Sequence, residues 1–358
     1  MAALVGAARR LVTNACGAFD PQAELVRELA EASALSEGSV RWALEHALEW
    51  RATEADCAAV VKNAGPDVSG SLAVVLSANV TTAALRALAC AVARSNHVRV
   101  YPSSRDPVLT ERLVAAAGLP GLTVVRTREE LPWADPSAHV VLYGSDGTAA
   151  RVRELVRGTL EVHGPGIGLA LLTDEDDVAS MGALAEDLAA FDQAGCLSPR
   201  LCIHIGDPAR GHFLSKSLHT ALEALGAARP IGALDPETRA ARARFRQVGT
   251  VLGQTFATTQ GVVVHATSGS PLPAPEARAL AVRTLSSLAD ADDWLGPLRP
   301  LITAVGARDH ALRSQFAPEA RLRRTDVGSM QRPPLDGPVD RRAVHSSHRI
   351  RGNVRLDG

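Results

Sequence analysis

Short aliphatic runs and helical stretches alternate between residues 72 and 156 of this chain, and that alternation restricts the possible folds more than any other feature. The apolar runs occupy residues 72–76, 97–101, 122–125 and 139–143, and turns bound each of them. Amphipathic stretches at 81–94, 106–117 and 148–156 separate or follow the runs. Parallel strands need a long crossover connection, usually a helix, so this order predicts βαβ units and a parallel sheet. Such sheets bind ligands at the carboxyl ends of their strands.

A second section of the same kind follows a glycine- and proline-rich cluster at residues 164–168. Its apolar runs are 169–172, 201–205, 262–264 and 301–305, and its predicted helices are 174–191, 218–225, 236–252 and 275–288. Helical periodicity also marks 23–35 and 39–61, and the last 35 residues are expected to lie across the body as extended chain. A chain of 358 residues is long enough for two such domains.

Charge, hydropathy and cysteine content exclude several classes of protein. Basic and acidic residues number 38 and 39, so no bulk positive field favours nucleic acid or an acidic membrane surface. No apolar run approaches the ~18 residues of a membrane span, and no signal sequence is recognised at the N-terminus. The histidines at 163, 204, 212 and 219 have no metal-ligand spacing, so no metal is expected. Five irregularly spaced cysteines do not fit a disulfide framework. We therefore expect the protein to lie in the reducing cytoplasm.

One cysteine stands in a sequence that suits nucleophilic chemistry. Cys196 lies in a polar turn, residues 192–199, between a predicted helix and a predicted strand. A nucleophilic thiol needs access, neighbouring backbone N–H groups and a lowered pKa, and a turn of this kind can supply them. Burial is expected for the other four cysteines, Cys16, Cys57, Cys90 and Cys202.

Polar residues follow the predicted strands of the first section, and each has two interpretations. Asn79 is either a helix N-cap or an amide that donates to an oxyanion. Gly144 and Ser145 open a helix after a strand, which suits either a phosphate or an ordinary strand-to-helix turn. The glycines within 164–168 lack the G-x-G-x-x-G spacing of a dinucleotide-binding loop.

Taken in order, these segments resemble the aldehyde dehydrogenase superfamily, and in particular its acyl-CoA reductase branch, which supplies fatty aldehyde in bacterial bioluminescence. The stretch Asp-Gln-Ala-Gly-Cys-Leu-Ser-Pro at 192–199 is similar to the nucleophile motif of that branch. The stretch Gly-Ser-Met-Gln-Arg-Pro-Pro-Leu-Asp at 328–336 is similar to its C-terminal signature. The motifs lie about 130 residues apart in the expected order, and the resemblance covers roughly residues 70–340.

The resemblance implies a role for each of these positions. Cys196 would be the nucleophile that takes the acyl group from a thioester, and Asn79 would bind the oxyanion together with the backbone N–H of Cys196. The residues implied in binding NADPH or NADH are Pro102 and Ser103 at the adenosine ribose, Gly144 and Ser145 at the pyrophosphate, and Gly164.

Two departures from the family pattern bear on the reaction. Tyr101 replaces the usual lysine near the ribose, which bears on the choice between NADPH and NADH. The glutamate that many aldehyde dehydrogenases use as a general base would fall near residue 162 or 163 and is missing, although Glu161 is close by. Hydrolysis of an acyl-enzyme needs such a base, whereas reduction by hydride or return of the acyl group to CoA does not.

We therefore expect an α/β protein with an aldehyde dehydrogenase-like fold and the active site between two domains. A Rossmann-like NAD(P)-binding domain would span 1–165 and 325–358, and a catalytic domain 166–324. The expected reaction is NAD(P)H-dependent reduction of an acyl thioester, fatty acyl on CoA or on an acyl carrier, to an aldehyde. A cytoplasmic homo-oligomer is expected. The alternatives are a non-acylating aldehyde dehydrogenase and a non-catalytic relative that acts as a binding subunit.

Overall fold

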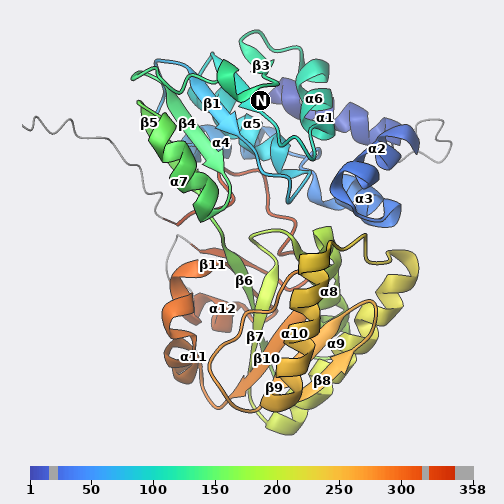
Figure 1. The fold of residues 1–358 in the computed structure, drawn as a ribbon. Helices are drawn as coiled ribbons and strands as arrows, with labels where there is room; N and C mark the ends of the chain where they lie inside the picture. The colour runs from blue at the N-terminus through green and yellow to red at the C-terminus, as the bar shows by residue number, and fades with distance from the viewer. Residues whose placement is uncertain (16–22, 317–321, 343–358) are drawn as a thin grey trace, which may run out of the picture.

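The computed structural model describes residues 1–15, 23–316 and 322–342 and contains two β-sheets, one above the other in Figure 1. The first sheet has the strand order β3-β2-β1-β4-β5, and all neighbouring strands are parallel. Its strands are β1 (Leu72–Val75), β2 (Val98–Tyr101), β3 (Leu122–Val124), β4 (His139–Tyr143) and β5 (Thr159–His163). The strand order reverses between β1 and β4, which is where a doubly wound sheet binds its ligands.

Helices cover both faces of the first sheet. One face carries α5 (Ala83–Arg94) and α6 (Val108–Ala117), and the N-terminal helices pack onto these through a shared apolar core. The other face carries α7 (Asp146–Leu155), whose Ala149 and Val152 pack with strand residues such as Leu142. The N-terminal elements are α1 (Ala2–Ala15), α2 (Ala23–Ser33), α3 (Glu37–Trp42), the π-helix η1 (Ala43–Ala47) and α4 (Glu54–Asn63).

The second sheet has the order β12-β11-β6-β7-β10-β9-β8. Its neighbouring strands are parallel except for β8, which is antiparallel to β9. The strands are β6 (Ile167–Thr173), β7 (Pro199–Ile205), β8 (Gly253–Ala257), β9 (Val262–Ala266), β10 (Ala279–Leu285), β11 (Ile302–Ala307) and β12 (Arg323–Thr325). The link from β5 to β6 joins the two sheets at residues 164–166.

Helices also enclose the second sheet. α8 (Val178–Ala189) and α9 (Pro208–Ala228) pack on one face, through leucines that include Leu184 and Leu218. The other face is covered by α10 (Pro236–Leu252), α11 (Leu288–Leu295) and α12 (His310–Phe316). None of the helices in the described part of the chain combines the length and the apolarity that a membrane crossing requires.

The predicted α/β architecture with parallel sheets is confirmed, but two local predictions are wrong. Residues 275–288 were expected to be helical, whereas 279–285 form β10. Alanine and leucine favour helices, yet Ala279, Leu280 and Ala281 are buried between β7 and β9, and burial in the centre of a sheet overrides propensity. The single helix expected at 39–61 ends at Ala47, and α4 begins after a capping box between Thr53 and Asp56.

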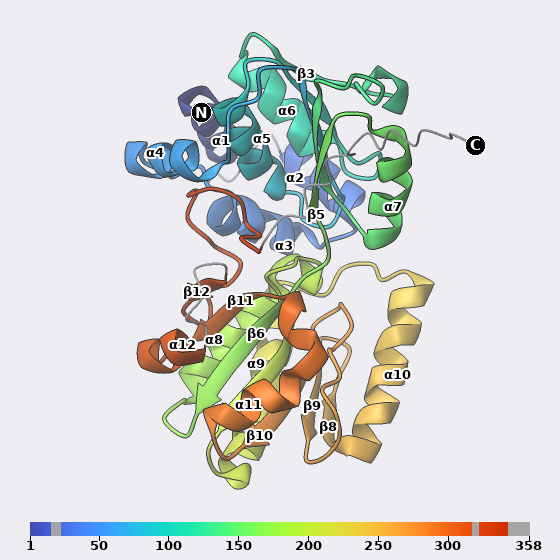
Figure 2. The same ribbon diagram turned by 90° about the vertical axis from the view of Figure 1, so that its left-hand side faces the viewer.

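A C-terminal strap, residues 326–342, connects the second sheet to the first. Figure 2 shows it as the red segment that leaves β12 and runs up beside α4. The buried carboxylate of Asp187 on α8 accepts hydrogen bonds from the backbone N–H groups of Gly328 (2.5 Å) and Met330 (2.9 Å). Burial raises the pKa of Asp187 to about 7, and these N–H donors oppose the rise. The strap is thereby fixed to the second half of the molecule.

The other end of the strap is held by the first half. Arg86 on α5 is buried and donates hydrogen bonds to the carbonyls of Pro333 (2.9 Å), Pro334 (2.7 Å) and Gly337 (2.8 Å). The predicted extended course of the C-terminus therefore agrees with the strap, while residues 343–358 lie outside the described residues.

Candidate active site

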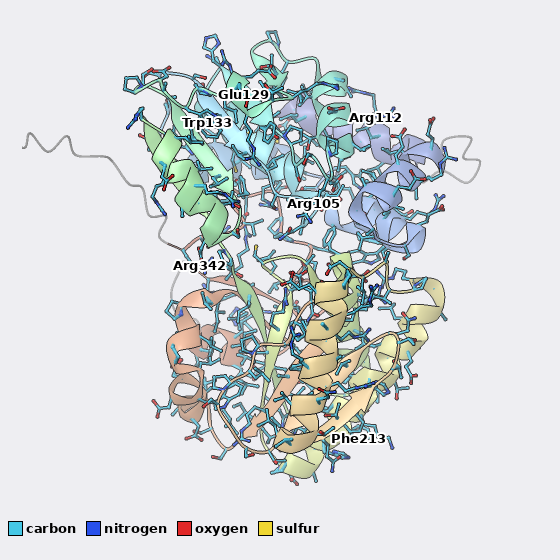
Figure 3. All side chains as sticks on the ribbon, in the orientation of Figure 1. Arg105, Arg112, Glu129, Trp133, Phe213 and Arg342 are labelled. Atoms are coloured by element: carbon cyan, nitrogen blue, oxygen red, sulfur yellow. The ribbon has the colours of Figure 1, made fainter. Side chains whose placement is uncertain are left out.

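A cavity of about 970 Å³ lies between the two sheets and is lined by both halves of the chain. The first half contributes the segments after β1, β2 and β4, and the second contributes the turn at Cys196 and part of the strap. Figure 3 places Arg105 in the lower part of the upper half and Arg342 at the junction of the two halves. The predicted site residues that line the cavity are Asn79, Ser103, Gly144, Ser145, Gly164 and Cys196. Pro102 is buried and does not belong to the lining.

The backbone just before Cys196 has an uncommon conformation. Phe191, Asp192 and Gln193 have φ angles of 53°, 46° and 70°, in the left-handed region that residues other than glycine seldom occupy. Each residue in such a conformation costs of order 1–3 kcal/mol, so it persists only where surrounding contacts impose it. The nucleophile motif therefore contains a strained turn.

A buried ion pair holds this turn. Arg278 is fully buried, and its Nε donates a hydrogen bond to Asp192 Oδ1 at 2.7 Å. The second carboxylate oxygen of Asp192 accepts from the backbone N–H of Gly232 at 2.8 Å. Because the Asp192 carbonyl also accepts from the N–H of Ala277 at 3.0 Å, backbone and side chain are fixed together.

Gln193 anchors the same turn to two strands. Its Oε1 accepts from the backbone N–H of Ala279 at 2.7 Å, and its Nε2 donates to the carbonyl of Pro199 at 2.6 Å. Ala279 begins β10 and Pro199 begins β7, so the amide joins both strands. The Asp-Gln pair of the motif thus positions Cys196.

Cys196 follows in a tight turn at the cavity wall. The backbone N–H of Ser198 closes the turn on the carbonyl of Gly195 at 3.0 Å, and the hydroxyl of Thr303 donates to the carbonyl of Cys196. Residue 168 on β6 must be glycine, because a Cβ there would collide with the carbonyl of Leu197. Gly168 therefore permits the close approach of β6 to this turn.

The electrostatics of the thiol differ from the expectation. Burial raises the pKa of the Cys196 thiol to about 11, and the Asp340 carboxylate on the strap raises it further, against the opposing charge of Arg342. The expected lowered pKa is wrong, because the turn encloses the sulfur beside a carboxylate. Only the thiolate is a competent nucleophile, so the reaction needs a group that accepts the thiol proton.

The other cysteines do not compete for this role. Cys90 and Cys202 are buried as predicted, and burial raises the thiol pKa of both. Cys57 is only half-buried, so the expected burial is wrong for that residue. Cys16 lies outside the described residues.

The loop after β1 brings Asn79 to the same cavity. A Cβ built on Gly195 would lie 3.2 Å from Val80 Cγ2, so this loop abuts the nucleophile turn. Helix α5 begins at Ala83 after Thr82, so the N-cap interpretation of Asn79 is wrong. Its amide remains a candidate for binding an oxyanion.

The N-terminus of α7 faces the cavity at Gly144 and Ser145. Ser145 is the N-cap, and its hydroxyl accepts from the backbone N–H of Thr148 at 3.3 Å. The side chain therefore caps the helix, while the helix end presents the backbone N–H groups and the positive dipole that bind phosphates. Asp146 opposes an anion here, since its carboxylate lies in the first turn.

The end of β2 presents a cation that sequence reasoning missed. Arg105 follows Ser103 and Ser104, is exposed and lines the cavity. The neighbouring Asp106 is buried, accepts a hydrogen bond from the Thr81 hydroxyl, and has a pKa raised by its burial. The charge available to a ligand at this strand end is therefore positive.

The strap supplies two further residues to which the sequence analysis assigned no role in the site. Gln331 is almost fully buried, and its Oε1 would lie 3.2 Å from a Cβ on Gly195. Asp340 lines the cavity and pairs with Arg342 at 2.7 Å. Gln331 lies inside the C-terminal signature, which was the one sequence signal for this wall of the site.

Glu161 does not take the place of the missing general base. Burial alone would raise its pKa, but hydrogen bonds with His139 and His163 and the charge of Arg94 hold that pKa well below its usual range. Its Oε2 lies 2.9 Å from Arg94 and 3.0 Å from His139, and Glu161 does not line the large cavity. Across residues 1–15, 23–316 and 322–342, no three His, Cys, Asp or Glu side chains are grouped to hold a metal ion.

Comparisons with known proteins identify the family and the fold. The model of a family described as Acyl-CoA reductase (LuxC) matches residues 49–334, whereas no curated protein matches the chain. An oxidoreductase from Marinobacter aquaeolei is similar with a TM-score of 0.70 at 10% identity, over 96% of this chain and 84% of that one.

Two dehydrogenases have the same fold. Methylmalonate-semialdehyde dehydrogenase from Oceanimonas doudoroffii is similar with a TM-score of 0.69 at 15% identity, over 93% of this chain and 78% of that one. An aldehyde dehydrogenase from Mycobacterium tuberculosis, solved with NAD+, is similar with a TM-score of 0.64 at 14% identity, over 91% and 77%. At these identities the likeness concerns the fold.

Removing the cation that anchors the turn should destabilise the protein. We expect Arg278→Leu to lower the free energy of unfolding by about 3–5 kcal/mol, because the Asp192 carboxylate would stay buried without its partner. Urea unfolding measures this change. Arg126→Ala removes the cation of an exposed pair with Glu111 and should cost at most about 1 kcal/mol. Equal losses in the two variants would contradict the anchoring role.

Proposed function

The chain belongs to the acyl-CoA reductase (LuxC) family, and on that premise we propose that it reduces an acyl thioester to an aldehyde with NADPH, through an acyl group held on Cys196. Family membership makes it an oxidoreductase that acts on acyl or aldehyde groups. One observation carries the finer proposal: an anchored turn presents Cys196 to a cavity that the carboxyl ends of the first sheet also line.

The proposed reaction begins with attack of the Cys196 sulfur on the thioester carbonyl. The thiol proton leaves to a base, a C–S bond forms, and the carbonyl oxygen becomes an oxyanion. Collapse breaks the C–S bond to the carrier and leaves S-acyl-Cys196. When bound, a reduced nicotinamide supplies the hydride that brings the acyl carbon to the aldehyde level. The resulting thiohemiacetal on Cys196 collapses: its C–S bond breaks, the aldehyde is released, and the hydroxyl proton restores the Cys196 thiol.

Two donors are proposed for the oxyanion. The side-chain amide of Asn79 lies on the loop that abuts the nucleophile turn, and the backbone N–H of Cys196 belongs to the turn itself. Donors that are fixed before the reaction stabilise developing charge without reorganisation. The hydrogen bonds and ion pair that hold residues 192 and 193 serve this purpose.

The cavity walls suit a hydrocarbon chain. Apolar side chains line it beside the nucleophile turn, from the α5 side and from the turn itself: Val80, Ala83, Ala87, Phe191 and Ala194. Burying an acyl chain against such walls is favourable by about 0.8 kcal/mol for each CH₂ group. We therefore propose a fatty acyl thioester, on CoA or on an acyl carrier, as the substrate.

A non-acylating aldehyde dehydrogenase is the less favoured alternative. That activity ends in hydrolysis, which needs a carboxylate to activate water against the acyl-enzyme. Glu161 is the nearest candidate in the sequence, but its carboxylate is already paired with Arg94, His139 and His163.

NADPH is proposed in preference to NADH because of the charge at the end of β2. An acidic residue near this strand end favours the ribose hydroxyl of NADH, whereas an arginine accommodates the 2′-phosphate of NADPH. Here Asp106 is buried and Arg105 lines the cavity. Ser103 at the ribose, the N-terminus of α7 at Gly144 and Ser145, and Gly164 complete the proposed cofactor site.

A cytoplasmic homo-oligomer is also proposed. The four cysteines within the described residues are free thiols, which suits a reducing compartment. β8 ends the second sheet with no further strand beyond it among the described residues, and such an edge is open to pairing with another copy.

Omission of reduced cofactor should trap the acyl group on the protein. Incubation with a fatty acyl-CoA should add one acyl mass per chain, mapped to Cys196 by peptide mass spectrometry and removed by hydroxylamine. Cys196→Ala should abolish both the adduct and aldehyde formation. Cys202→Ala should retain both, because Cys202 is fully buried on β7. An adduct on another cysteine would overturn the proposed mechanism.

Asn79→Ala tests the oxyanion site. Loss of one such donor lowers turnover by about 10²–10³. Cofactor affinity and melting temperature should change little, because Asn79 caps no helix in this structure. Unchanged turnover would remove Asn79 from the reaction.

Arg105→Ala tests the choice of cofactor. We expect the Kd for NADPH to rise about 10–100-fold, the value of one lost hydrogen bond to a charged group, while the Kd for NADH stays nearly the same. Arg112→Ala is the matched control, because Arg112 pairs with Glu28 away from the cavity, as Figure 3 shows by its place on the outer side of the upper half. Equal weakening of both cofactors in Arg105→Ala would contradict 2′-phosphate recognition.

A further inference from the structure

The pairing of β6 with β11 is interrupted beside the nucleophile turn. Ile167 pairs with Ile302 and Gly168 pairs with Ala304, so Thr303 is an extra residue on β11 without a partner on β6. A second irregularity interrupts the pairing of β6 with β7 directly after Gly168. Such bulges are rare between parallel strands, and beside active sites they turn a side chain in a new direction. None of the reaction steps uses the bulge at Thr303.

The side chain at this bulge reaches Cys196. Thr303 has no exposed surface, and its hydroxyl donates a hydrogen bond to the backbone carbonyl of Cys196. The same hydroxyl lies 3.1 Å from the carbonyl oxygen of Ile167. Residue 166 must be glycine, because a Cβ there would collide with Thr303 Cγ2. Gly166, in the link between the two sheets, therefore leaves the space that Thr303 occupies.

Hydrogen bonds fix the peptide groups on both sides of Cys196. The peptide before it is held through the carbonyl of Gly195, which accepts from the backbone N–H of Ser198 at 3.0 Å. The peptide after it is held through its own carbonyl, which accepts from Thr303. Because each peptide group is planar, fixing the two planes fixes both backbone dihedral angles of Cys196. The directions of its N–H and of its side chain follow from those angles.

The backbone N–H of Cys196 lies beside its own sulfur. Burial raises the pKa of the Cys196 thiol to about 11, and this N–H opposes the rise as a hydrogen-bond donor. During acyl transfer the attacked carbon bonds to the sulfur, so its oxygen forms close to the same N–H. A donor placed there before the reaction can stabilise the oxyanion without reorganisation. The orientation of Cys196 therefore sets two groups at once, the nucleophile and the donor.

The other contacts of the turn do not hold this second peptide group. Asp192 and Gln193 fix the backbone before Cys196, through Arg278 and the strands at Ala279 and Pro199. The side chains of Leu197 and Met330 pack with Cys196 in an apolar cluster. Apolar burial is not directional, so such packing fills space without orienting a carbonyl. The directional contact on this side of the nucleophile is the hydroxyl of Thr303.

We propose that Thr303 is a positioning residue for acyl transfer. Its hydroxyl fixes the peptide plane after Cys196, and thereby aims the sulfur and the backbone N–H that binds the oxyanion. Thr303 does not line the cavity, so it acts through Cys196 without touching the substrate. This inference rests on the proposed thioester reduction.

The first measurement is the rate of acylation with reduced cofactor left out. The protein is mixed with a fatty acyl-CoA at several concentrations, quenched at intervals, and its acyl adduct is quantified by intact mass spectrometry. We expect Thr303→Val to lower the maximal rate constant about 10–100-fold, since misplacement by 1 Å can cost about 10²-fold. The acyl-CoA concentration for half the maximal rate should change less than about threefold. Thr303→Ser keeps the hydroxyl and should restore most of the rate.

Unfolding of the variant cannot imitate this result. The rate constant comes from the exponential time course, so unfolded molecules lower the amplitude of the adduct and leave the rate constant unchanged. Ser215→Ala is the matched control, because Ser215 is buried, donates to the carbonyl of Gly211 at 2.8 Å within α9 and does not line the cavity. Its maximal rate constant should equal that of the wild type.

The second measurement is amide hydrogen exchange in the turn, which does not depend on any activity. Peptides that cover residues 194–199 should exchange about 2–10-fold faster in Thr303→Val, the value of one neutral hydrogen bond. The same peptides should exchange at the wild-type rate in Thr303→Ser and in Ser215→Ala.

Each outcome decides the inference. Acylation and exchange at the wild-type rates in Thr303→Val would overturn it and leave the proposed function standing. An equal loss of rate in Thr303→Ser would also overturn it, because the hydroxyl would then not be the cause. If the wild type itself forms no acyl adduct, the proposed function fails and the role in acyl transfer fails with it, whereas exchange in the turn still shows whether Thr303 holds Cys196.

Discussion

The buried contact between Asp192 and Arg278 is the constraint on which the candidate site depends. Arg278 has no exposed surface, and its guanidinium lies 2.6 Å from Asp192 Oδ1. That pair helps to hold the left-handed backbone at residues 191–193, because three such residues in succession are unfavourable on their own. We therefore assign the ion pair the role of fixing the conformation of the turn that carries the nucleophile.

Much of the fold could be predicted from local pattern, and the failures have physical causes. The strands at 72–75 and 139–143 are buried aliphatic runs between turns, which a sequence reveals directly. β10 could not be found in this way, because its alanines and leucines suit a helix and only pairing with β7 and β9 decides the matter. Cys196 was recognisable from its motif, whereas Arg105 and Asp340 reach the cavity only through the tertiary course of the loop after β2 and of the strap.

The structure holds the Cys196 thiol in place but does not ionise it. Enclosure raises the pKa of the Cys196 thiol to about 11, so the resting sulfur carries its proton. A neutral thiol resists oxidation and adventitious electrophiles better than a thiolate does. The cluster of Glu161, Arg94, His139 and His163 belongs to the first half of the chain, where the Glu161 carboxylate is paired with Arg94. Reactivity in this arrangement depends on where one proton resides.

The strap has a consequence for how the protein is made. A chain leaves the ribosome from its N-terminus, so the first sheet forms before the strap exists. Until then the Arg86 guanidinium lacks the carbonyls of Pro333, Pro334 and Gly337 that later satisfy it. The cavity also lacks the wall that Gln331 and Asp340 supply. A chain without the strap would therefore lack both the partners of Arg86 and this wall of the cavity.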